Sequence, residues 1–215
     1  MTGMASPRRL GAPDAKNRTV LLDATERLMV EQGYAAVSSR RVAEAAGLKP
    51  QLVHYYFRTM DELFSAVFAR SAERLIEVHT LALQASQPLW ALWRFSTDPA
   101  ATALTMEFIA LANHRKDLRA EIGRYVEHVR LDAARVIEES LTRYGVDPED
   151  MPAVVAITLM TSVSRVLIVE ESLGMKPGQK ETLEFVESYL RKLEGEPHID
   201  ELEALTGVSA PNNPA

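Results

Sequence analysis

The sequence predicts an all-α protein in which a short three-helix domain near the N-terminus precedes a longer helical domain. Apolar residues recur with the 3.6-residue period of an amphipathic helix in one segment after another, and strict apolar–polar alternation, typical of a half-buried strand, is absent. Several glycines and prolines stand at the ends of these periodic segments, where they start or stop helices. We expect about nine or ten helices from this pattern.

The N-terminal domain is expected to cover residues 16–60. Its three helices are predicted at Lys16–Gln32, from Ser38 or Ser39 to Gly47, and at Pro50–Tyr56. Glycine suits the position just past a helix end, as at Gly33 and Gly47, and proline suits the first helical turn. Residues 1–15 are rich in Pro, Gly, Ala and Arg and show no periodicity, so we expect them to form a disordered arm.

Residues 61–208 are expected to form the second, larger domain. Its helices are predicted at Thr59–Ala85, Leu89–Ser96, Ala100–His114, Lys116–Tyr144, Ala153–Leu173, Gln179–Glu194 and Ile199–Leu205. Thr59 and Glu62 have the spacing of a capping box at the start of the first of these helices. Gly145 and Gly174 stand where two of the others are expected to end.

Composition excludes several classes of protein. The 215 residues are 47% hydrophobic and 25% charged, which is an ordinary globular balance, and they include no cysteine. Disulfide frameworks and cysteine-based zinc sites are therefore excluded, and a reducing cytosol fits. The first residues contain no apolar stretch of the kind that marks a secretory signal.

Charge is divided unevenly along the chain. The net charge of −6 combines +4 in residues 1–60 with −10 in residues 61–215. This acidic total argues against a protein that coats nucleic acid non-specifically. A basic head on an acidic body fits a protein that presents only its N-terminal domain to phosphates, although chance clustering would give the same distribution.

The stretch Val42–Tyr56 has the spacing of a helix-turn-helix, which packs two short helices at a steep angle across a tight turn. Ala43 supplies the small residue needed where the helices cross, and Gly47 supplies a turn residue that tolerates positive φ. Val53 supplies the aliphatic residue that faces inward from the second helix. The remaining inward positions are filled by Val42, Ala46, Leu48 and Tyr56. The alternative is an ordinary αα-corner within a helical bundle.

Residues not needed inside this motif are suited to duplex DNA. Glutamine can pair bidentately with adenine and leucine can contact a thymine methyl group, which favours Gln51 and Leu52 as base contacts. Serine and lysine at the motif's edge suit phosphates, which position a protein without specifying sequence. The full candidate set is Ser38, Ser39, Arg40, Arg41, Lys49, Pro50, Gln51, Leu52, His54, Tyr55 and Tyr56. A solvated surface side chain is the alternative for any one of them.

Residues Val20–Ala69 resemble the DNA-binding domain of the TetR family of bacterial repressors. The matching pieces are Leu28–Tyr34, Ser39–Leu48, Val53–Phe57 and Asp61–Leu63. The rest of the chain resembles the family only in the number and length of its helices. The resemblance implies a homodimer that binds a palindromic operator and is released from DNA by a small molecule. By position it also implies that Arg40, Pro50, Gln51, Leu52 and His54 face bases, whereas Tyr55 and Tyr56 face the backbone.

One position departs from the family pattern. Met60 stands where the family usually has a lysine that contacts phosphate at the start of the fourth helix. Met60 cannot make that contact by charge, so we expect the contact to be lost or left to the helix N-terminus and Arg58. The recognition loop Lys49–Leu52 is also unusual, so no base preference is taken from the family.

The segment Ala153–Leu173 is apolar on nearly all sides. Such a helix must be covered on more than one face, and together with Gln179–Glu194 it would form half of a four-helix bundle between two subunits. A single core helix in a monomer is the alternative. A membrane span is disfavoured because the apolar run Pro152–Val169 contains Arg165 and several hydroxyl side chains and lacks aromatic flanks.

Aromatic and methionine side chains in the second domain suit a mostly apolar small-molecule effector, with Trp90, Trp93, Met106, Phe108, Tyr125 and His128 as candidates. Each could equally belong to the core. The histidines lack metal-ligand spacing, and no zinc-protease, nucleophile-elbow, P-loop or dinucleotide motif is present. We therefore expect no metal, no cofactor and no enzymatic activity.

Taken together, these features predict a ligand-responsive transcriptional regulator that acts as a repressor. Its expected partners are double-stranded DNA, a small effector and a second copy of the chain, with no membrane. Its expected location is the cytoplasm, in association with the nucleoid. The main alternative is a helical protein-interaction module that does not bind DNA.

Overall fold

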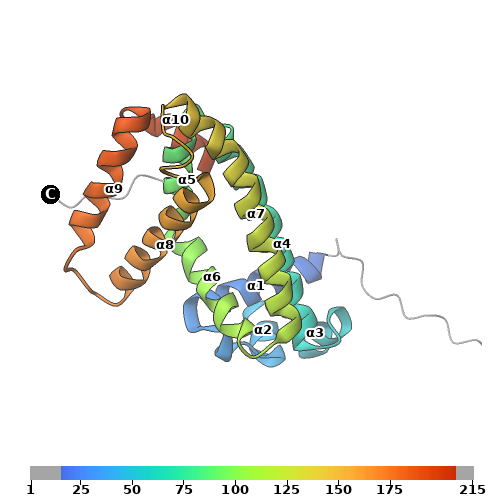
Figure 1. Ribbon diagram of the computed structural model, residues 1–215. Coiled ribbons are helices and arrows are strands. Elements are labelled where there is room, and N and C mark those ends of the chain that lie inside the picture. The colour runs from blue at the N-terminus through green and yellow to red at the C-terminus, as the bar shows by residue number, and fades with distance from the viewer. Residues whose placement is uncertain (1–15, 207–215) are drawn as a thin grey trace, which may run out of the picture. The chain divides into compact units, whose positions relative to one another are not determined.

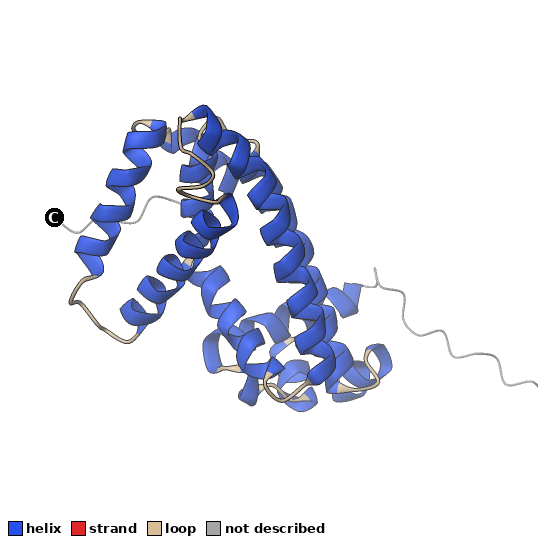
Figure 2. Ribbon diagram, viewed as in Figure 1, coloured by secondary structure: helices blue, strands red, loops and turns tan. Residues whose placement is uncertain are grey.

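The computed structural model describes residues 16–206, which form ten α-helices and one short 3-10 helix and contain no strand (Figures 1 and 2). The elements are α1 (Lys16–Gln32), the 3-10 helix Tyr34–Ala36, α2 (Ser39–Ala45), α3 (Pro50–Tyr56), α4 (Met60–Leu83), α5 (Pro88–Ser96), α6 (Pro99–Ala112), α7 (Lys116–Arg143), α8 (Ala153–Ser172), α9 (Gln179–Glu194) and α10 (Ile199–Thr206). The predicted all-α fold with an N-terminal helix-turn-helix is confirmed. The arm predicted for residues 1–15 lies outside the described residues, as do residues 207 and 208 of the predicted second domain.

Helix boundaries follow the start and stop signals of the sequence closely. The predicted bounds of α1, α3 and α9 are confirmed, and Ser38 is the N-cap of α2. The predicted ends of α4 at Ala85 and of α6 at His114 are wrong, because both helices end earlier. Tight turns close them: Gln84 N–H donates to Leu81 O at 3.0 Å and Asn113 N–H donates to Ala110 O at 3.3 Å. Apolar periodicity alone does not reveal such turns.

The described chain forms two compact units. The first unit contains residues 16–71 and Ala103–Leu118, and the second unit contains Ala72–Thr102 and the residues from Arg119 onward. The division falls within α4, α6 and α7, so each of these helices contributes to both units. The units do not coincide with the predicted boundary at residue 60, because the start of α4 and a segment from the middle of the chain belong with the N-terminal helices.

Apolar packing holds the first unit together. The helices α1, α2 and α3 contact one another and bury Leu21, Met29, Val42 and Val53 almost completely. From outside the three-helix head, Phe68 of α4 and Phe108 of α6 pack edge to face, with 5.2 Å between their ring centroids. Because each fully buried side chain of this size contributes about 1.5–3 kcal/mol, packing rather than helix propensity determines how the short helices α2 and α3 are held.

Polar contacts attach α6 and the α6–α7 turn to the same unit. The Tyr34 backbone N–H donates to Glu107 Oε2 at 2.6 Å. Arg115 Nε donates to Asp61 Oδ1, in the first turn of α4, at 2.5 Å, and the Arg115 guanidinium lies over the Phe64 ring. These contacts explain why Ala103–Leu118 belongs to the same compact unit as the helix-turn-helix.

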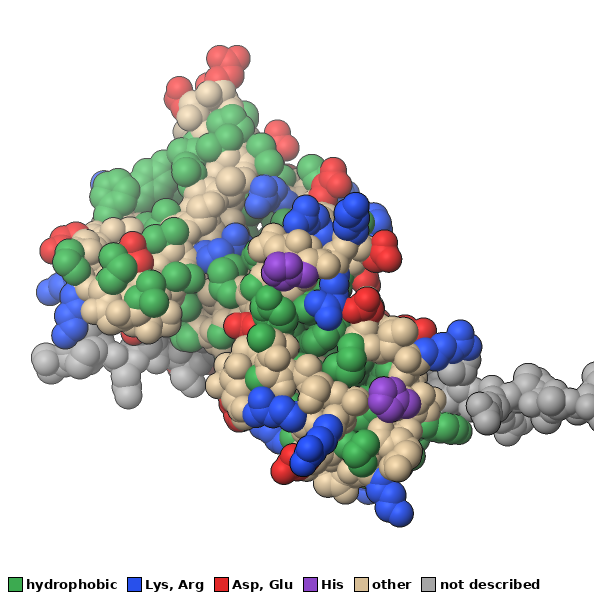
Figure 3. Space-filling view, turned by 90° about the horizontal axis from the view of Figure 1, so that it is seen from below, with side chains coloured by type: hydrophobic (Ala, Val, Ile, Leu, Met, Phe, Trp, Pro, Cys, Tyr) green, Lys and Arg blue, Asp and Glu red, His purple; other side chains and the backbone are tan. Residues whose placement is uncertain are grey.

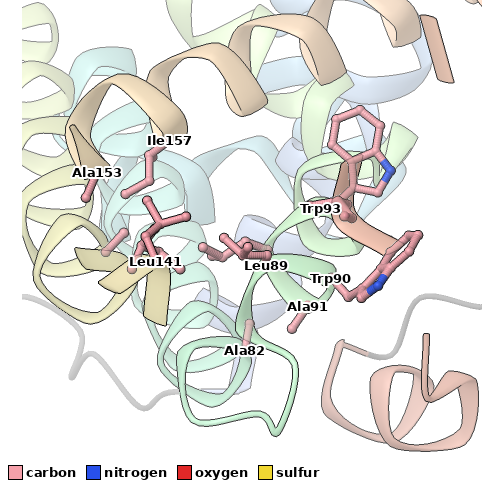
Figure 4. Close-up of a cluster of buried hydrophobic side chains, with 12 residues drawn as sticks. Ala82, Leu89, Trp90, Ala91, Trp93, Leu141, Ala153 and Ile157 are labelled. Carbon is pink, nitrogen blue, oxygen red and sulfur yellow. The ribbon is translucent and has the colours of Figure 1, made fainter. Parts of the chain in front are cut away.

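Helix α5 is central to the second unit, where it packs against α8, α9 and α10. Figure 4 shows its buried side chains meeting those of α7 and α8 in one hydrophobic cluster, which includes Leu89, Trp90, Trp93, Leu141 and Ile157. The N-terminus of α5 is capped from α9: Glu194 Oε1 accepts the Leu89 N–H at 3.0 Å, and Glu194 Oε2 accepts the Trp90 N–H at 2.9 Å. A carboxylate at this end also interacts favourably with the helix dipole.

Candidate nucleic-acid interface

The turn between α2 and α3 is a glycine-terminated helix end. Gly47 has a φ of 66°, in the left-handed region. The Leu48 N–H donates to Ala43 O at 2.9 Å and the Gly47 N–H donates to Glu44 O at 3.1 Å, which is the pair of bonds that defines a Schellman motif. Ala43 is completely buried at the crossing, and Pro50 occupies the first turn of α3. The structural roles predicted for Ala43, Gly47 and Pro50 are confirmed.

We expect Gly47→Ala to lower the free energy of unfolding by about 1–2 kcal/mol, which is the cost of a Cβ in left-handed backbone. Apart from Gly47 and its two chain neighbours, no heavy atom lies within 4 Å of the place that a Cβ at Gly47 would occupy, so the cost comes from the backbone and not from a clash. Gly47→Asn should recover part of the loss because asparagine tolerates this conformation better. Urea unfolding of the three proteins measures these differences, and equal stability of the glycine and alanine forms would contradict the turn geometry.

Helix α3 buries one side and exposes the other. Val53 is buried, and Leu52 and Tyr56 are half-buried. Pro50, Gln51, His54 and Tyr55 are exposed, and the Tyr55 ring stands edge-on to the Tyr56 ring. The exposed side chains therefore form a polar and aromatic face on a helix whose opposite side is fixed in the core.

The residues that flank α3 differ in whether their side chains already make hydrogen bonds within the protein. The Ser38 hydroxyl accepts the Arg41 N–H at 3.4 Å as the N-cap of α2. The Arg41 guanidinium donates to Ala36 O at 3.1 Å and to the Gln32 side chain, so it braces the connection between α1 and α2. Ser39 is half-buried, whereas Arg40 and Lys49 are exposed. The predicted DNA contacts of these residues stay predictions, with Arg40 and Lys49 the most accessible of them.

The start of α4 carries a capping-box-like arrangement, in which the Glu62 carboxylate reaches back to the Arg58 N–H and not to that of the N-cap Thr59. The Glu62 N–H donates to Thr59 Oγ1 at 3.0 Å, and the Arg58 N–H donates to Glu62 Oε2 at 2.7 Å. Met60 is half-buried beside these groups. Because the carboxylates of Asp61 and Glu62 lie in this first turn, they oppose the approach of a phosphate to the helix N-terminus. Arg58 is exposed beside this turn, and its contact with phosphate stays a prediction.

Sequence reasoning missed three residues that support this interface. Arg27 Nη2 donates to Ala45 O at 2.9 Å and so holds the end of α2. Glu107 and Arg115 make the contacts with Tyr34 and Asp61 described above. The one available signal was Glu107, because it is the only charged residue in the otherwise apolar α6.

The six predicted effector-binding residues are divided between the compact units. Trp90 and Trp93 belong to the buried cluster of the second unit, and Trp90 Nε1 donates to Gly195 O at 3.0 Å. Tyr125 and His128 are on α7 in the second unit, whereas Met106 and Phe108 are on α6 in the first. Effector contact by these residues stays a prediction.

Burial shifts the pKa values of Tyr125 and His79 in the second unit. Burial raises the pKa of the Tyr125 phenol to about 12. It lowers the pKa of the buried His79 imidazole, which stands edge-on to Phe95, and the nearby Asp132 carboxylate opposes this shift only in part. Both groups therefore favour their neutral forms near neutral pH.

Helices α8 and α9 expose large apolar side chains. They are Val154, Val155, Leu159 and Val166 on α8 and Phe185 and Tyr189 on α9, with Phe185 72% exposed. Figure 3 shows hydrophobic side chains at the surface of this part of the molecule. Exposed apolar surface of this kind is typical of protein or membrane interaction sites and of ligand grooves.

Helix α8 is also the one described helix that is long and apolar enough to cross a membrane, judged by length and composition alone. A single helix that passes this test is weak evidence, because core helices of soluble proteins also pass it. Its first turn and middle are anchored in the second unit, with Ala153, Ile157 and Ser164 buried. A helix that packs in a core on one side and is covered by a partner on the other accounts for the same composition.

The described residues contain one cluster that has the composition of a hydrolase triad. Ser86 Oγ donates to Glu201 Oε2 at 2.6 Å, and His198 Nδ1 lies 3.3 Å from Ser86 Oγ. A serine nucleophile requires the imidazole to stand between the hydroxyl and the carboxylate. Here the carboxylate accepts a hydrogen bond directly from the serine hydroxyl, so the cluster links the α4–α5 turn to α10 and has no catalytic arrangement. In the part of the chain that the structure describes, no group of three or more His, Cys, Asp or Glu side chains is placed to hold a metal ion.

Comparison with known proteins agrees with this geometry. Residues 21–67 match a family described as bacterial regulatory proteins, tetR family. The HTH-type transcriptional regulator BetI of Rhizobium meliloti (strain 1021) is 28% identical over 122 residues, which are 53% of this chain and 60% of that protein. The HTH-type transcriptional regulator PksA of Bacillus subtilis (strain 168) is 30% identical over 112 residues, which are 48% of this chain and 55% of that protein. The chain thus spans little more than half the length of these curated relatives.

Solved structures extend the likeness beyond the helix-turn-helix. A TetR transcription regulator from Haloarcula marismortui ATCC 43049 is 20% identical with a TM-score of 0.65, covering 82% of this chain and 97% of that one. A transcriptional regulator from Rhodococcus sp. Rha1 is 19% identical with a TM-score of 0.59, covering 88% of this chain and 96% of that one. At these identities the structures show a shared fold. Residues 21–67, which contain the helix-turn-helix, thus match the TetR family of bacterial regulatory proteins, and the chain shares the fold of solved transcriptional regulators over most of its length.

Proposed function

We propose that this chain is a ligand-responsive transcriptional repressor that binds a palindromic operator as a homodimer in the cytoplasm and is released by a small, mostly apolar effector. The observation that carries the proposal is the exposed face of α3. Gln51, His54 and Tyr55 are exposed there, while Val53 fixes the opposite side of the helix in the core.

The exposed side chains match what an α-helix needs in a major groove. Gln51 can pair bidentately with an adenine, and a good bidentate pair is worth about 1–3 kcal/mol of discrimination against the wrong base. Arg40 and Lys49 are exposed cations beside this helix and suit phosphates, which set register without reading sequence. In a dimer, two such helices would enter successive major grooves about 34–36 Å apart.

We expect Gln51→Ala and His54→Ala each to weaken binding to the operator by roughly 10- to 100-fold, the equivalent of losing one specific base contact. Fluorescence anisotropy against a duplex from the chain's own upstream DNA, with a scrambled duplex beside it, measures this change. Glu31→Gln is the matched control, because Glu31 is equally exposed in the first unit but lies at the end of α1.

The salt dependence of binding separates specific from general contacts. Lys49→Ala should weaken binding to both duplexes and reduce the dependence of affinity on salt, as the loss of one phosphate contact does. If the unchanged protein binds neither duplex in a salt-sensitive way, or binds both equally, the repressor proposal is wrong and a protein-interaction module becomes the better hypothesis.

The homodimer is supported by the exposed apolar side chains of α8 and α9. Val154, Leu159 and Val166 lie at intervals along α8, and Phe185 and Tyr189 are one turn apart on α9. Two copies of such a helix pair can cover each other in a four-helix bundle about a two-fold axis. An isologous interface of this kind would also place two identical helix-turn-helix domains on one palindromic site.

The effector response is supported by the continuity of the helices between the units. Residues 60–71 of α4 belong to the first unit and residues 72–83 to the second, and α6 and α7 also pass from one unit to the other. An effector bound in the second unit can therefore shift α4 and change the spacing of the heads. The effector can change the affinity for DNA only by as much as its own affinities for the DNA-binding state and the released state differ.

A further inference from the structure

The guanidinium of Arg94, in the last turn of α5, has two buried donor atoms without an acceptor. Its Nε and Nη2 atoms are buried, and neither is hydrogen-bonded within the described part of the chain. Arg70 Nε is also buried without an acceptor, but the Arg70 Nη1 and Nη2 atoms pair with Asp23 at 2.6 Å and Glu26 at 2.8 Å. The charge of Arg70 is therefore compensated, whereas no described carboxylate pairs with Arg94.

Two buried donors without an acceptor make the charge of the half-buried Arg94 side chain costly. Arginine stays protonated in proteins, so Arg94 cannot escape the cost by losing its proton. Buried charges are ordinarily paired, and a buried donor with no acceptor calls for a specific explanation, such as a ligand. The position of Arg94, on the same short helix as the buried Trp90 and Trp93, places this unpaired charge within the second unit.

The identity of the two unpaired atoms indicates what would pair with them. The N–H of Nε and one N–H of Nη2 point in the same direction along one edge of the planar guanidinium. This edge forms two parallel hydrogen bonds with the two oxygens of a carboxylate. A single negative charge is sufficient to neutralise it, which suits an apolar surrounding better than a doubly charged phosphate ester would.

We propose that Arg94 binds the carboxylate of the effector, which is therefore an organic acid with an apolar body. This inference rests on the proposed effector response and narrows the class of effector. Arg94 is the residue that orients the acid, and the acid in turn compensates a charge that the ligand-free protein leaves unpaired.

Stability without any ligand provides the first test. Arg94→Met keeps an unbranched side chain and removes the unpaired charge, so the ligand-free variant should have a higher melting temperature than the unchanged protein. Arg124→Met, an exposed arginine on α7 in the same unit, is the control and should leave the melting temperature unchanged. If Arg94 instead had an internal partner, Arg94→Met would lower the melting temperature, and the proposal would fall.

Titration with defined acids provides the second test. The chain has two tryptophans, Trp90 and Trp93, both on α5 beside Arg94, so intrinsic fluorescence reports on this helix alone. The probes are octanoate, decanoate and indole-3-acetate, each with its primary amide as the uncharged counterpart. At least one acid should bind, and its amide should bind about 10- to 100-fold more weakly, as expected for the loss of charge-assisted hydrogen bonds. Indole-3-acetate is followed by calorimetry because it fluoresces itself.

The Arg94 variants complete the test. Arg94→Met should lose the preference for acid over amide, and Arg94→Lys should recover only part of it because an ammonium lacks the planar fork. Equal binding of acids and amides, or no binding of any acid, would overturn the proposal. Operator binding by the same ligand-free variants is measured in parallel: if it persists while the acid preference fails, only the carboxylate inference is wrong, and if it is absent from the unchanged protein, the proposed function itself is wrong.

Discussion

The variant Leu159→Glu is expected to be monomeric and to bind the operator at least about 100-fold more weakly than the unchanged protein. Leu159 is 52% exposed on α8, in the surface through which we propose that two copies associate. A carboxylate buried in an apolar interface without a partner is strongly unfavourable. A monomer then binds only one half-site. In a dimer, binding of the first helix-turn-helix domain raises the effective concentration of the second one at its half-site, and a monomer lacks this gain.

Light scattering after size exclusion and fluorescence anisotropy at fixed salt measure the two parts of this prediction. Leu131→Glu is a closely matched control, because Leu131 is 53% exposed in the same unit but lies on α7. Phe185→Glu, on α9, should repeat the effect of Leu159→Glu from the second helix of the bundle. A dimer of Leu159→Glu with full operator affinity would show that α8 and α9 do not form the interface.

The sequence was sufficient to predict the helix-turn-helix because every requirement of this motif is local. The small residue Ala43, the left-handed Gly47 and the inward Val53 lie within eleven consecutive residues, and each is set by short-range backbone geometry or by one crossing of two helices. The bounds of α1, α3 and α9 were predictable for the same reason, because capping and apolar periodicity are local signals.

Contacts between distant parts of the chain could not be predicted in this way. Nothing near Tyr34 in the sequence indicates that its N–H bonds to Glu107, and nothing near Asp61 indicates its pairing with Arg115. These contacts place Ala103–Leu118 in the same unit as the reading head, which no periodicity reveals. Nothing in the sequence marks Arg94, because a single arginine at the end of a helix usually interacts with the helix carbonyls and solvent. Its lack of a partner is visible only in the folded chain.

Trp93 shows how burial decides between two roles that composition leaves equal. Because Trp93 is 1% exposed and belongs to the buried cluster drawn in Figure 4, we expect Trp93→Ala to lower the free energy of unfolding by about 3–5 kcal/mol, as large-to-small changes of buried tryptophan do. His128 was an equal candidate for effector contact, but its side chain is exposed and pairs with Asp132 at 3.2 Å. His128→Ala should therefore change stability by no more than about 0.5 kcal/mol.

Urea unfolding followed by circular dichroism compares the two variants without relying on tryptophan fluorescence. The contrast tests the packing of α5 itself. A tryptophan that lined an open site would already contact solvent, so its removal would cost little stability but would weaken effector binding. If Trp93→Ala unfolds at the same urea concentration as the unchanged protein but loses its response to organic acids, Trp93 lines the effector site. If Trp93→Ala loses the expected stability, the buried side chains of α5 form the packed support that holds Arg94 in place, and the effector site is formed at the C-terminal end of that helix.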